Sequence, residues 1–194
     1  MTIIPAMAAS SHRHTPGARL ALCLSLLGVI CGAARADVAA IPGPLENRSE
    51  AVLPLADRLV LYKAERRLEL MRGAEVLRSY RVALGLDPVG HKQREGDFRT
   101  PEGEYRLVRR NSLSDYFLSI QVSYPNDRDV ARARRNGVSP GGAIMIHGLP
   151  NAPRKPLDYY ASNDWTDGCI AVMNSEMVEI WLMTPPDTPI QILP

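Results

Sequence analysis

The stretch that decides the fold of this 194-residue chain is Thr166-Asp167-Gly168-Cys169-Ile170-Ala171, together with Ile146-His147-Gly148 upstream of it. The first stretch places a cysteine after a glycine, and the second places a histidine at the end of an apolar run. A thiol is mostly protonated at neutral pH, and a nearby imidazole can lower its pKa and yield the reactive thiolate. Glycine permits a sharp turn that aims backbone N–H groups at a bound carbonyl oxygen. Cys169 is therefore a candidate nucleophile served by His147, against the alternative that both are ordinary structural residues.

The N-terminus has the pattern of a secretory signal peptide. Residues 1–19 carry basic but no acidic side chains, Leu20–Gly32 is a continuous apolar run, and Ala34-Arg35-Ala36 offers a cleavage site. We therefore predict a cleaved signal peptide over residues 1–36. The alternative is a retained membrane anchor, which needs about 20 apolar residues, more than this run contains. Cleavage removes the other two cysteines, so Cys169 would have no disulfide partner in its own chain.

The charge and the remaining ligand-type residues exclude several classes of function. The chain carries 23 Lys and Arg against 21 Asp and Glu, and removal of three arginines with the signal peptide leaves 20 against 21. Nothing in this near-neutral balance suggests binding to nucleic acid. After cleavage the only His and Cys side chains are His91, His147 and Cys169, whose spacing fits no zinc site. We therefore expect no nucleic acid partner, no metal and no cofactor.

The pattern of apolar residues predicts many short strands in the second part of the chain. Residues 37–56 contain Pro42-Gly43-Pro44 and several charged side chains and are predicted to be a linker, which leaves 57–194 as one domain. Alternation or apolar runs predict strands over residues 59–63, 67–72, 76–84, 104–109, 118–123, 143–146 and 189–193. A helix is predicted near the end, capped by Asn174 and stopped by Pro185. The fold class is therefore mainly β, a sandwich or barrel with one or two short helices.

A long loop that contains several prolines, residues 149–165, joins the candidate histidine to the candidate cysteine. Long loops in compact domains tend to be functional. We predict that Tyr159, Tyr160 and Trp165 wall a peptide channel and that Arg154 meets a carboxylate of the peptide. The alternative is a stiff surface loop whose aromatic rings pack on the domain.

The histidine and cysteine stretches occur with further motifs. Gly85–Tyr105 contains a "G…P.G.K…GD..TP.G.Y" type of pattern, and Ser123–Asp127 and Pro140–Gly142 also fit. Together these stretches resemble the L,D-transpeptidase (YkuD-type) catalytic domain over about residues 57–194. The combination is specific, whereas any single piece is not.

The resemblance implies a β-sandwich fold with the cysteine beside a channel. It implies that Cys169 is the nucleophile, that His147 takes its proton, and that the Gly148 carbonyl orients the imidazole. The backbone amides of Asp167, Gly168 and Cys169 are expected to form the oxyanion hole. The implied reaction takes place on peptidoglycan stem peptides in the periplasm, and we expect a monomer. The thiolate attacks the carbonyl of diaminopimelate, expels D-alanine, and passes the acyl group to an amine or to water.

Two residues depart from the family pattern. Asp167 stands where most members carry a second histidine, and Ala171 stands where many carry Arg or Asn. A carboxylate beside a thiol raises its pKa unless it points away. Three alternatives stay open: a cysteine hydrolase on the same polymer, an amidase that releases lipoprotein from peptidoglycan, and a non-catalytic wall-binding module. The acceptor is also open, and an outer-membrane lipoprotein is one candidate.

Overall fold

The computed structural model describes residues 53–194 of the 194-residue chain. The predicted signal peptide, residues 1–36, and nearly all of the predicted linker, residues 37–56, lie outside the described residues. Within the described part, no helix is both long and apolar enough to span a lipid bilayer.

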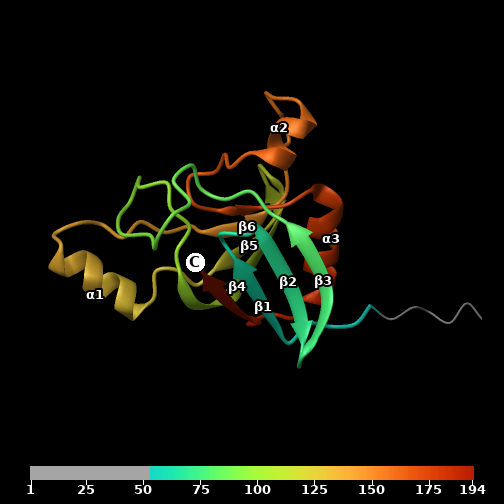
Figure 1. Cartoon of the computed structure of the whole chain (residues 1–194), viewed down its shortest axis with the longest axis horizontal. Coiled ribbons are helices and arrows are strands. Elements are labelled where there is room, and N and C mark those ends of the chain that lie inside the picture. The colour runs from blue at the N-terminus through green and yellow to red at the C-terminus, as the bar shows by residue number, and fades with distance from the viewer. Residues whose placement is uncertain (1–52) are drawn as a thin grey trace, which may run out of the picture. The chain divides into compact units, whose positions relative to one another are not determined.

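Residues 53–194 form a mainly β domain with eight strands and three helices (Figure 1). The strands are β1 Arg58–Tyr62, β2 Arg67–Arg72, β3 Glu75–Arg81, β4 Gly103–Ser114, β5 Phe117–Val122, β6 Met145–His147, β7 Ile170–Ala171 and β8 Pro189–Leu193. The helices are α1 Asp127–Arg135, α2 Leu157–Ser162 and α3 Asn174–Met183. The prediction of a mainly β fold is confirmed, with one helix more than expected. α2 has six residues and no side-chain cap, and a helix this short shows no helical periodicity in the sequence.

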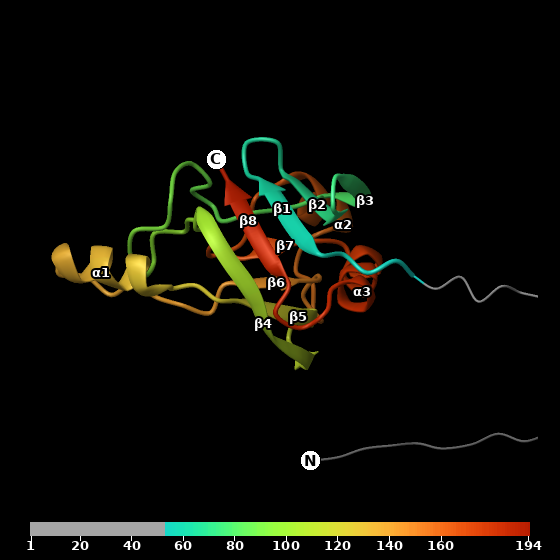
Figure 2. The ribbon, with the colours of Figure 1, turned by 90° about the horizontal axis from the view of Figure 1, so that it is seen from below.

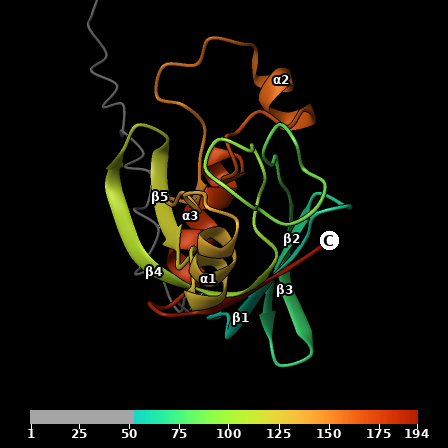
Figure 3. The same cartoon turned by 90° about the vertical axis from the view of Figure 1, so that its left-hand side faces the viewer.

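One strand, β4, bends the sheet into two halves. The strand order is β3-β2-β1-β8-β4-β5-β6-β7. The first residues of β4, Gly103–Arg106, pair with β8, whereas Leu107 and later residues pair with β5. The register shifts between Leu107 and Arg109, and a bulge of this kind bends a strand and increases its twist. The β4–β5 hairpin and β1–β3 consequently lie on two sides of α3 (Figure 3).

Backbone pairing beyond the named strands links the two ends of this order. Ala83 lies just beyond β3 and exchanges two hydrogen bonds with Ala171 of β7, at 2.9 and 2.8 Å. Gly85 forms a second bridge with Thr166. Because β3 and β7 are the outermost strands, these bridges curl the sheet and place the segment before β7 against the segment after β3.

The core lies inside this curled sheet and is completed by α3. In the first half, β4, β8 and β1 lie side by side (Figure 2) and turn alternate residues inward. Buried apolar side chains of the strands include Leu59, Leu61, Leu68, Leu70, Leu107, Ile120, Val122, Ile146, Ile170, Ile190 and Ile192. Met177, Ile180 and Met183 of α3 are fully buried in the same cluster. The helix therefore holds the two halves together by packing.

The start of α3 differs from the prediction. Asn174 is the first helical residue, and the cap position belongs to Met173. The Asn174 side chain instead accepts a hydrogen bond from the backbone N–H of Leu149 at 2.8 Å. The Met173 N–H donates to the Glu176 carboxylate at 2.8 Å, which satisfies a backbone donor at the helix start. Asn174 thus ties the chain after β6 to α3.

A buried lysine fixes the long connection between β3 and β4. Lys63 is 2% exposed. Its ammonium group donates to the carbonyl oxygens of Gly90 and Thr100 at 2.6 and 2.9 Å and to the Glu102 carboxylate at 2.8 Å. Burial lowers the pKa of Lys63, and the hydrogen bond to Glu102 opposes that shift. All three ammonium donors are satisfied, so the connection is held against the end of β1.

A second ion pair shapes the turn inside this connection. The Lys92 ammonium donates to the Asp97 carboxylate at 2.7 Å. Asp97 also accepts from the backbone N–H groups of Gln93, Arg94 and Arg99 at 2.6, 3.1 and 3.2 Å. Burial raises the pKa of Asp97, but these four hydrogen bonds outweigh it, so the pKa lies below its ordinary value. The carboxylate therefore stays ionised and fixes the turn.

We expect Lys63→Met to lower the free energy of unfolding by about 3 kcal/mol, because it leaves Glu102 and two carbonyl groups without their buried partner. Urea denaturation followed by circular dichroism measures the loss. The exposed Lys155→Met is the matched control and should change stability by less than about 0.5 kcal/mol. Equal stabilities of the two variants would show that the buried lysine is not an anchor.

Candidate active site

The pairing of two short strands brings His147 and Cys169 to the same side of the sheet. β6 and β7 run parallel, with Ile146 opposite Ile170 and His147 opposite Ala171. Side chains two residues apart along a strand point to the same face. Cys169 therefore shares the face of Ala171 and is a diagonal neighbour of His147. Both side chains line one cavity.

A single backbone contact fixes the tautomer of the imidazole. His147 is 4% exposed, and its Nδ1 lies 2.7 Å from the carbonyl oxygen of Gly148. A carbonyl oxygen only accepts, so Nδ1 carries the proton and Nε2 has a free lone pair. Burial lowers the pKa of His147 to about 4, although the Gly148 hydrogen bond opposes the shift. The imidazole is therefore neutral at physiological pH and able to accept a proton at Nε2.

Gly148 is required by close approach rather than by a turn. A Cβ atom at this position would lie 2.5 Å from Oδ1 of Asn174 and 3.1 Å from the Cβ of Phe117. Gly148 is absent from the glycines with positive φ, so its backbone conformation alone does not require glycine. The small residue instead lets α3 and β5 close on the chain beside the histidine.

The Cys169 thiol lies in a partly buried position. Its Sγ donates to the Ala143 carbonyl oxygen at 3.7 Å. Burial raises the pKa of Cys169, and the Asp167 carboxylate raises it further, while a backbone hydrogen bond from Met145 and the charge of Lys92 oppose the shift. The resting site therefore pairs a neutral thiol with a neutral imidazole.

A threonine organises the loop that precedes the thiol. The Thr166 hydroxyl accepts from the Gly168 N–H at 3.1 Å and donates to the Cys169 carbonyl at 2.8 Å. The Gly168 amide, which the sequence assigned to an oxyanion hole, is thus already engaged within the loop. The amides of Asp167 and Cys169 are the remaining candidates for that role.

Gly168 lets this loop rest on the β3–β4 connection. Its φ is +130°, and a Cβ atom would lie 2.6 Å from the carbonyl oxygen of Arg99. Gly85 is equally restricted, because a Cβ there would lie 2.0 Å from the Phe98 carbonyl oxygen and 3.0 Å from the Cα of Gly168. Three backbone segments therefore meet directly beneath Cys169.

The cavity that contains the two residues has a volume of about 360 Å³. Its walls come from the β4–β5 hairpin, from β6 with the residues before it, and from the segment before β7. The lining residues are Asn111, Leu113, Ser114, Asp115, Tyr116, Ser119, Ala143, Met145, His147, Trp165, Thr166, Asp167 and Cys169. A cavity of this size fits a few residues of an extended peptide rather than a folded partner.

Two aromatic rings flank the imidazole. The Tyr116 ring centroid lies 4.6 Å from that of His147, and the Trp165 centroid lies 5.6 Å from it in an edge-on arrangement. The two flanking rings are themselves 6.2 Å apart. They keep the imidazole in place and reduce its contact with water, which agrees with its low pKa.

The hairpin wall was missed by the sequence reasoning. The hairpin is fastened by Asn151, whose Nδ2 donates to the Ser114 carbonyl at 2.8 Å and whose Oδ1 accepts from the Phe117 N–H at 2.9 Å. The backbone N–H of Asn151 donates to the Asp115 carbonyl at 2.9 Å. The sequence does not indicate that Asn151 fastens the hairpin or that Tyr116 contacts His147, because both contacts form only in the tertiary structure.

The four residues predicted to bind substrate separate into different roles. Trp165 lines the cavity. Tyr160 is 8% exposed and supports Trp165 from behind, since its carbonyl accepts from the indole Nε1 at 3.3 Å and its hydroxyl accepts from the Arg154 N–H at 3.0 Å. Tyr159 packs edge-on against Tyr160. Arg154 is exposed. Tyr159, Tyr160 and Arg154 do not line the cavity. For the two tyrosines, the alternative of aromatic rings packed on the domain therefore describes the structure.

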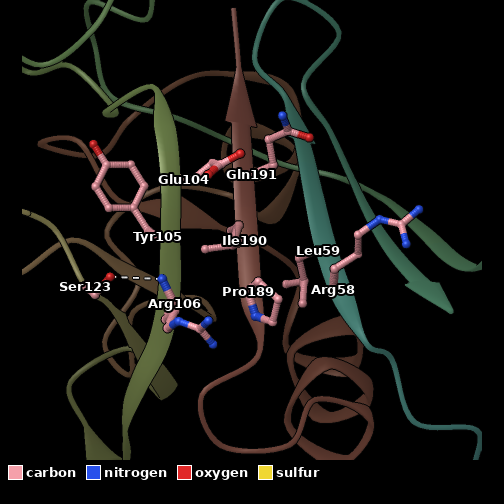
Figure 4. Close-up of a pocket in the computed structure, with 9 residues that line it drawn as sticks. All are labelled: Arg58, Leu59, Glu104, Tyr105, Arg106, Ser123, Pro189, Ile190 and Gln191. Carbon is pink, nitrogen blue, oxygen red and sulfur yellow. Dashed lines mark hydrogen bonds between the residues drawn. The ribbon is translucent and has the colours of Figure 1, made fainter. Parts of the chain in front are cut away.

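A second hollow, of about 520 Å³, lies over the outer surface of β1, β8 and β4 (Figure 4). It is lined by Arg58, Leu59, Glu104, Tyr105, Arg106, Ser123, Pro189, Ile190 and Gln191. The backbone N–H of Arg106 donates to the Ser123 hydroxyl at 2.9 Å, as the dashed line shows. None of the predicted site residues lies there, so this hollow is not the candidate active site. In residues 53–194, no cluster of three or more His, Cys, Asp or Glu is arranged to hold a metal ion.

Comparison with known proteins assigns the domain. Residues 56–192 match the family model of the YkuD L,D-transpeptidase catalytic domain. The chain belongs to this L,D-transpeptidase family. The matched region is nearly the whole described domain and includes both His147 and Cys169.

Individual relatives match over shorter regions. YafK of Escherichia coli strain K12, which is named provisionally as an L,D-transpeptidase, is 38% identical over 95 residues, covering 45% of this chain and 36% of that protein. The chain thus spans only about a third of the length of the curated relatives that it matches. A variant of Pgp2, a helical cell shape determining protein of Campylobacter jejuni, superposes with a TM-score of 0.51 at 25% identity, covering 73% of this chain and 50% of that chain. The Pgp2 protein itself gives 0.51 at 24% identity, over 74% and 51% of the two chains, and shows the same fold.

In this L,D-transpeptidase domain we expect Gly168→Ala to cost roughly 2 kcal/mol or more, because the added methyl group meets the Arg99 carbonyl in a strained backbone conformation. Thermal unfolding measures the loss. Gly137→Ala is the matched control, since its φ is also positive but no atom lies within 4 Å of the new Cβ. It should cost about 1 kcal/mol, and a loss as large as that of Gly168→Ala would contradict the close-approach argument.

We also expect alkylation of Cys169 by neutral iodoacetamide to speed up continuously with pH to above about pH 8.5, because the resting thiol is protonated. Mass spectrometry of the Cys169 peptide at a series of pH values measures the rate. Trp165→Phe, which retains an aromatic wall, should keep the same profile. A rate plateau that begins near pH 6 would instead reveal a preformed thiolate–imidazolium pair.

Proposed function

We propose that this chain is a peptidoglycan L,D-transpeptidase in which Cys169 is the nucleophile and His147 the general base. The observation that carries the proposal is the pair itself. A neutral imidazole with Nδ1 held by the Gly148 carbonyl and a partly buried thiol share one peptide-sized cavity. The L,D-transpeptidase family of the domain supports the substrate class, and Pgp2 is named for determining cell shape.

The first half-reaction acylates the enzyme. The thiol of Cys169 attacks the carbonyl carbon of diaminopimelate in the stem tetrapeptide, while Nε2 of His147 takes the thiol proton. Because both groups are neutral at rest, proton transfer accompanies the attack instead of preceding it. The tetrahedral oxyanion accepts hydrogen bonds from the amides of Asp167 and Cys169. The imidazolium then gives its proton to the amine of D-alanine, which leaves.

The second half-reaction resolves the thioester. An amine from another stem peptide attacks the acyl carbon, and neutral His147 takes a proton from that amine. The imidazolium then gives this proton to the departing sulfur of Cys169, which restores the neutral thiol. The Gly148 carbonyl stabilises the imidazolium in both half-reactions because it accepts the Nδ1–H bond. The flanking rings of Tyr116 and Trp165 limit water, which favours an amine over hydrolysis.

The proposal also includes export. The apolar run and cleavage site within residues 1–36 support a signal peptide that delivers a monomeric enzyme to the periplasm. The substrate is found in that compartment, and the enzyme needs no cofactor there. A lone cysteine is also safe from intramolecular disulfide formation in an oxidising environment.

The test is incubation of the purified protein with a tetrapeptide-containing muropeptide, followed by mass spectrometry. We expect loss of D-alanine, a thioester adduct on Cys169, and a cross-linked dimer. Cys169→Ala should abolish all three, and His147→Asn should slow adduct formation by roughly 10²- to 10⁴-fold. Glu104→Gln, a change on the outer surface of β4, is the control that should leave the rate unchanged.

Other outcomes would contradict the proposal in distinct ways. A tripeptide product without dimer would identify a hydrolase. Activity only on a lipoprotein–peptidoglycan conjugate would identify an amidase. If the wild type and Cys169→Ala gave the same products from both substrates, the remaining interpretation would be a non-catalytic wall-binding module.

A further inference from the structure

The charge of the active-site cavity is one-sided. Its lining includes two carboxylates, Asp115 and Asp167, and no lysine or arginine. Within residues 53–194, neither carboxylate forms an ion pair at 4.0 Å or less. The cavity therefore carries two uncompensated negative charges where the substrate reacts.

Nearby cations do not neutralise this charge. The imidazole of His147 is uncharged at neutral pH. Lys92 contributes to the field at Cys169, but it does not line the cavity and its ammonium is committed to Asp97 at 2.7 Å. Asp115 and Asp167 are both solvent-exposed, so a positively charged group that enters the cavity can reach their carboxylates.

A buried hydroxyl gives a second, independent indication of a polar ligand. Ser119 of β5 lies directly opposite His147 of β6 in the antiparallel pair, lines the cavity and is 4% exposed. Within residues 53–194 its hydroxyl makes no hydrogen bond and is open to the cavity, so it is free to bond to a ligand there. A polar group of the substrate would supply that partner.

The position of Asp167 has a cost for the proposed reaction. Its carboxylate disfavours ionisation of the Cys169 thiol, two residues along the chain. A bound cation would offset this effect, because it cancels the field of the carboxylate at the sulfur. A cation bound beside Asp167 would therefore favour the thiolate of Cys169.

We propose that the active-site cavity binds a primary ammonium group of the substrate through the carboxylates of Asp115 and Asp167 and the hydroxyl of Ser119. The inference rests on the proposed function, which supplies the reacting peptide. An ammonium group offers three donors, and these three side chains offer acceptors. Occupation of this subsite both selects peptides that carry a free side-chain amine and removes the penalty that Asp167 imposes on the thiol.

The ammonium group has two sources, the donor peptide or the acceptor peptide. The experiment separates them. In the donor arm, the purified chain reacts with a stem tetrapeptide whose side-chain amine is either free or acetylated, and the rate of thioester formation is followed by mass spectrometry. In the acceptor arm, thioester preformed on the enzyme is mixed with a peptide that carries one primary amine, and the amine concentration that gives half-maximal resolution is measured.

If the donor carries the ammonium group, the ratio of thioester formation rates from the free and the acetylated donor should be roughly tenfold higher for the wild type than for Asp167→Asn. If the acceptor carries it, the amine concentration for half-maximal resolution should be roughly tenfold lower for the wild type than for Asp167→Asn. Asp115→Asn should weaken the same preference, which protects the test if one variant folds poorly. Glu104→Gln removes a charge outside the cavity and should keep the wild-type preference. Circular dichroism verifies that each variant is folded.

The opposite results are equally clear. Equal thioester formation from free and acetylated donors, together with unchanged acceptor saturation in both aspartate variants, would overturn the ammonium subsite while leaving the transpeptidase proposal intact. No thioester from any donor would instead overturn the proposed function. A gain of preference in Asp167→Asn would also contradict the subsite, because it would show that the carboxylate repels the selected group.

Discussion

The ammonium group of Lys63 supports the whole site from a distance. By holding the carbonyl groups of Gly90 and Thr100, it fixes both ends of the connection that carries Phe98 and Arg99. The backbone of that connection is in turn the surface on which Gly168 rests. The Cys169 thiol is thus positioned by a series of backbone contacts that begins at a buried charge, in a domain whose core is mainly apolar. A buried ion is costly unless every donor is satisfied, and here every donor is.

The chemistry of the site follows from the same exclusion of water. Burial pushes the pKa of His147 down and that of Cys169 up, so both groups are driven toward their uncharged forms. A preformed ion pair would need stabilisation that the cavity does not provide, since its fixed charges are carboxylates. The imidazole is orientated by a backbone carbonyl instead of a side-chain carboxylate, which suits a base that becomes charged only during the reaction.

The sequence predicted those features that depend on local pattern or on residue type. Alternation in 67–72 predicted the strand whose Leu68 and Leu70 are fully buried, and the paired histidine and cysteine stretches predicted a shared site. The predictions from the sequence failed where tertiary contacts determine the role of a residue. Asn174 is a residue type that commonly caps helices, but its side-chain oxygen accepts a hydrogen bond from the backbone N–H of Leu149 instead.

Tyr116 lies in a hairpin turn, where nothing in the sequence indicates a histidine partner. The need for glycine at position 148 comes from Asn174 of α3 and Phe117 of β5, which only the folded chain brings near. The assignment of the Asp167, Gly168 and Cys169 amides to an oxyanion hole stays a prediction. However, a threonine hydroxyl two residues away occupies the Gly168 amide, and local pattern does not reveal that.

The register between β6 and β7 has a consequence for how such enzymes diversify. His147 and Cys169 are held by strand pairing, so the geometry of the pair does not depend on the length of the segment that connects them. Much of that segment, from Asn151 to Asn163, forms neither strand. Insertions or replacements there would change the surface beside the cavity without moving His147 or Cys169. Evolution can therefore remodel this segment while the sheet conserves the geometry of the pair.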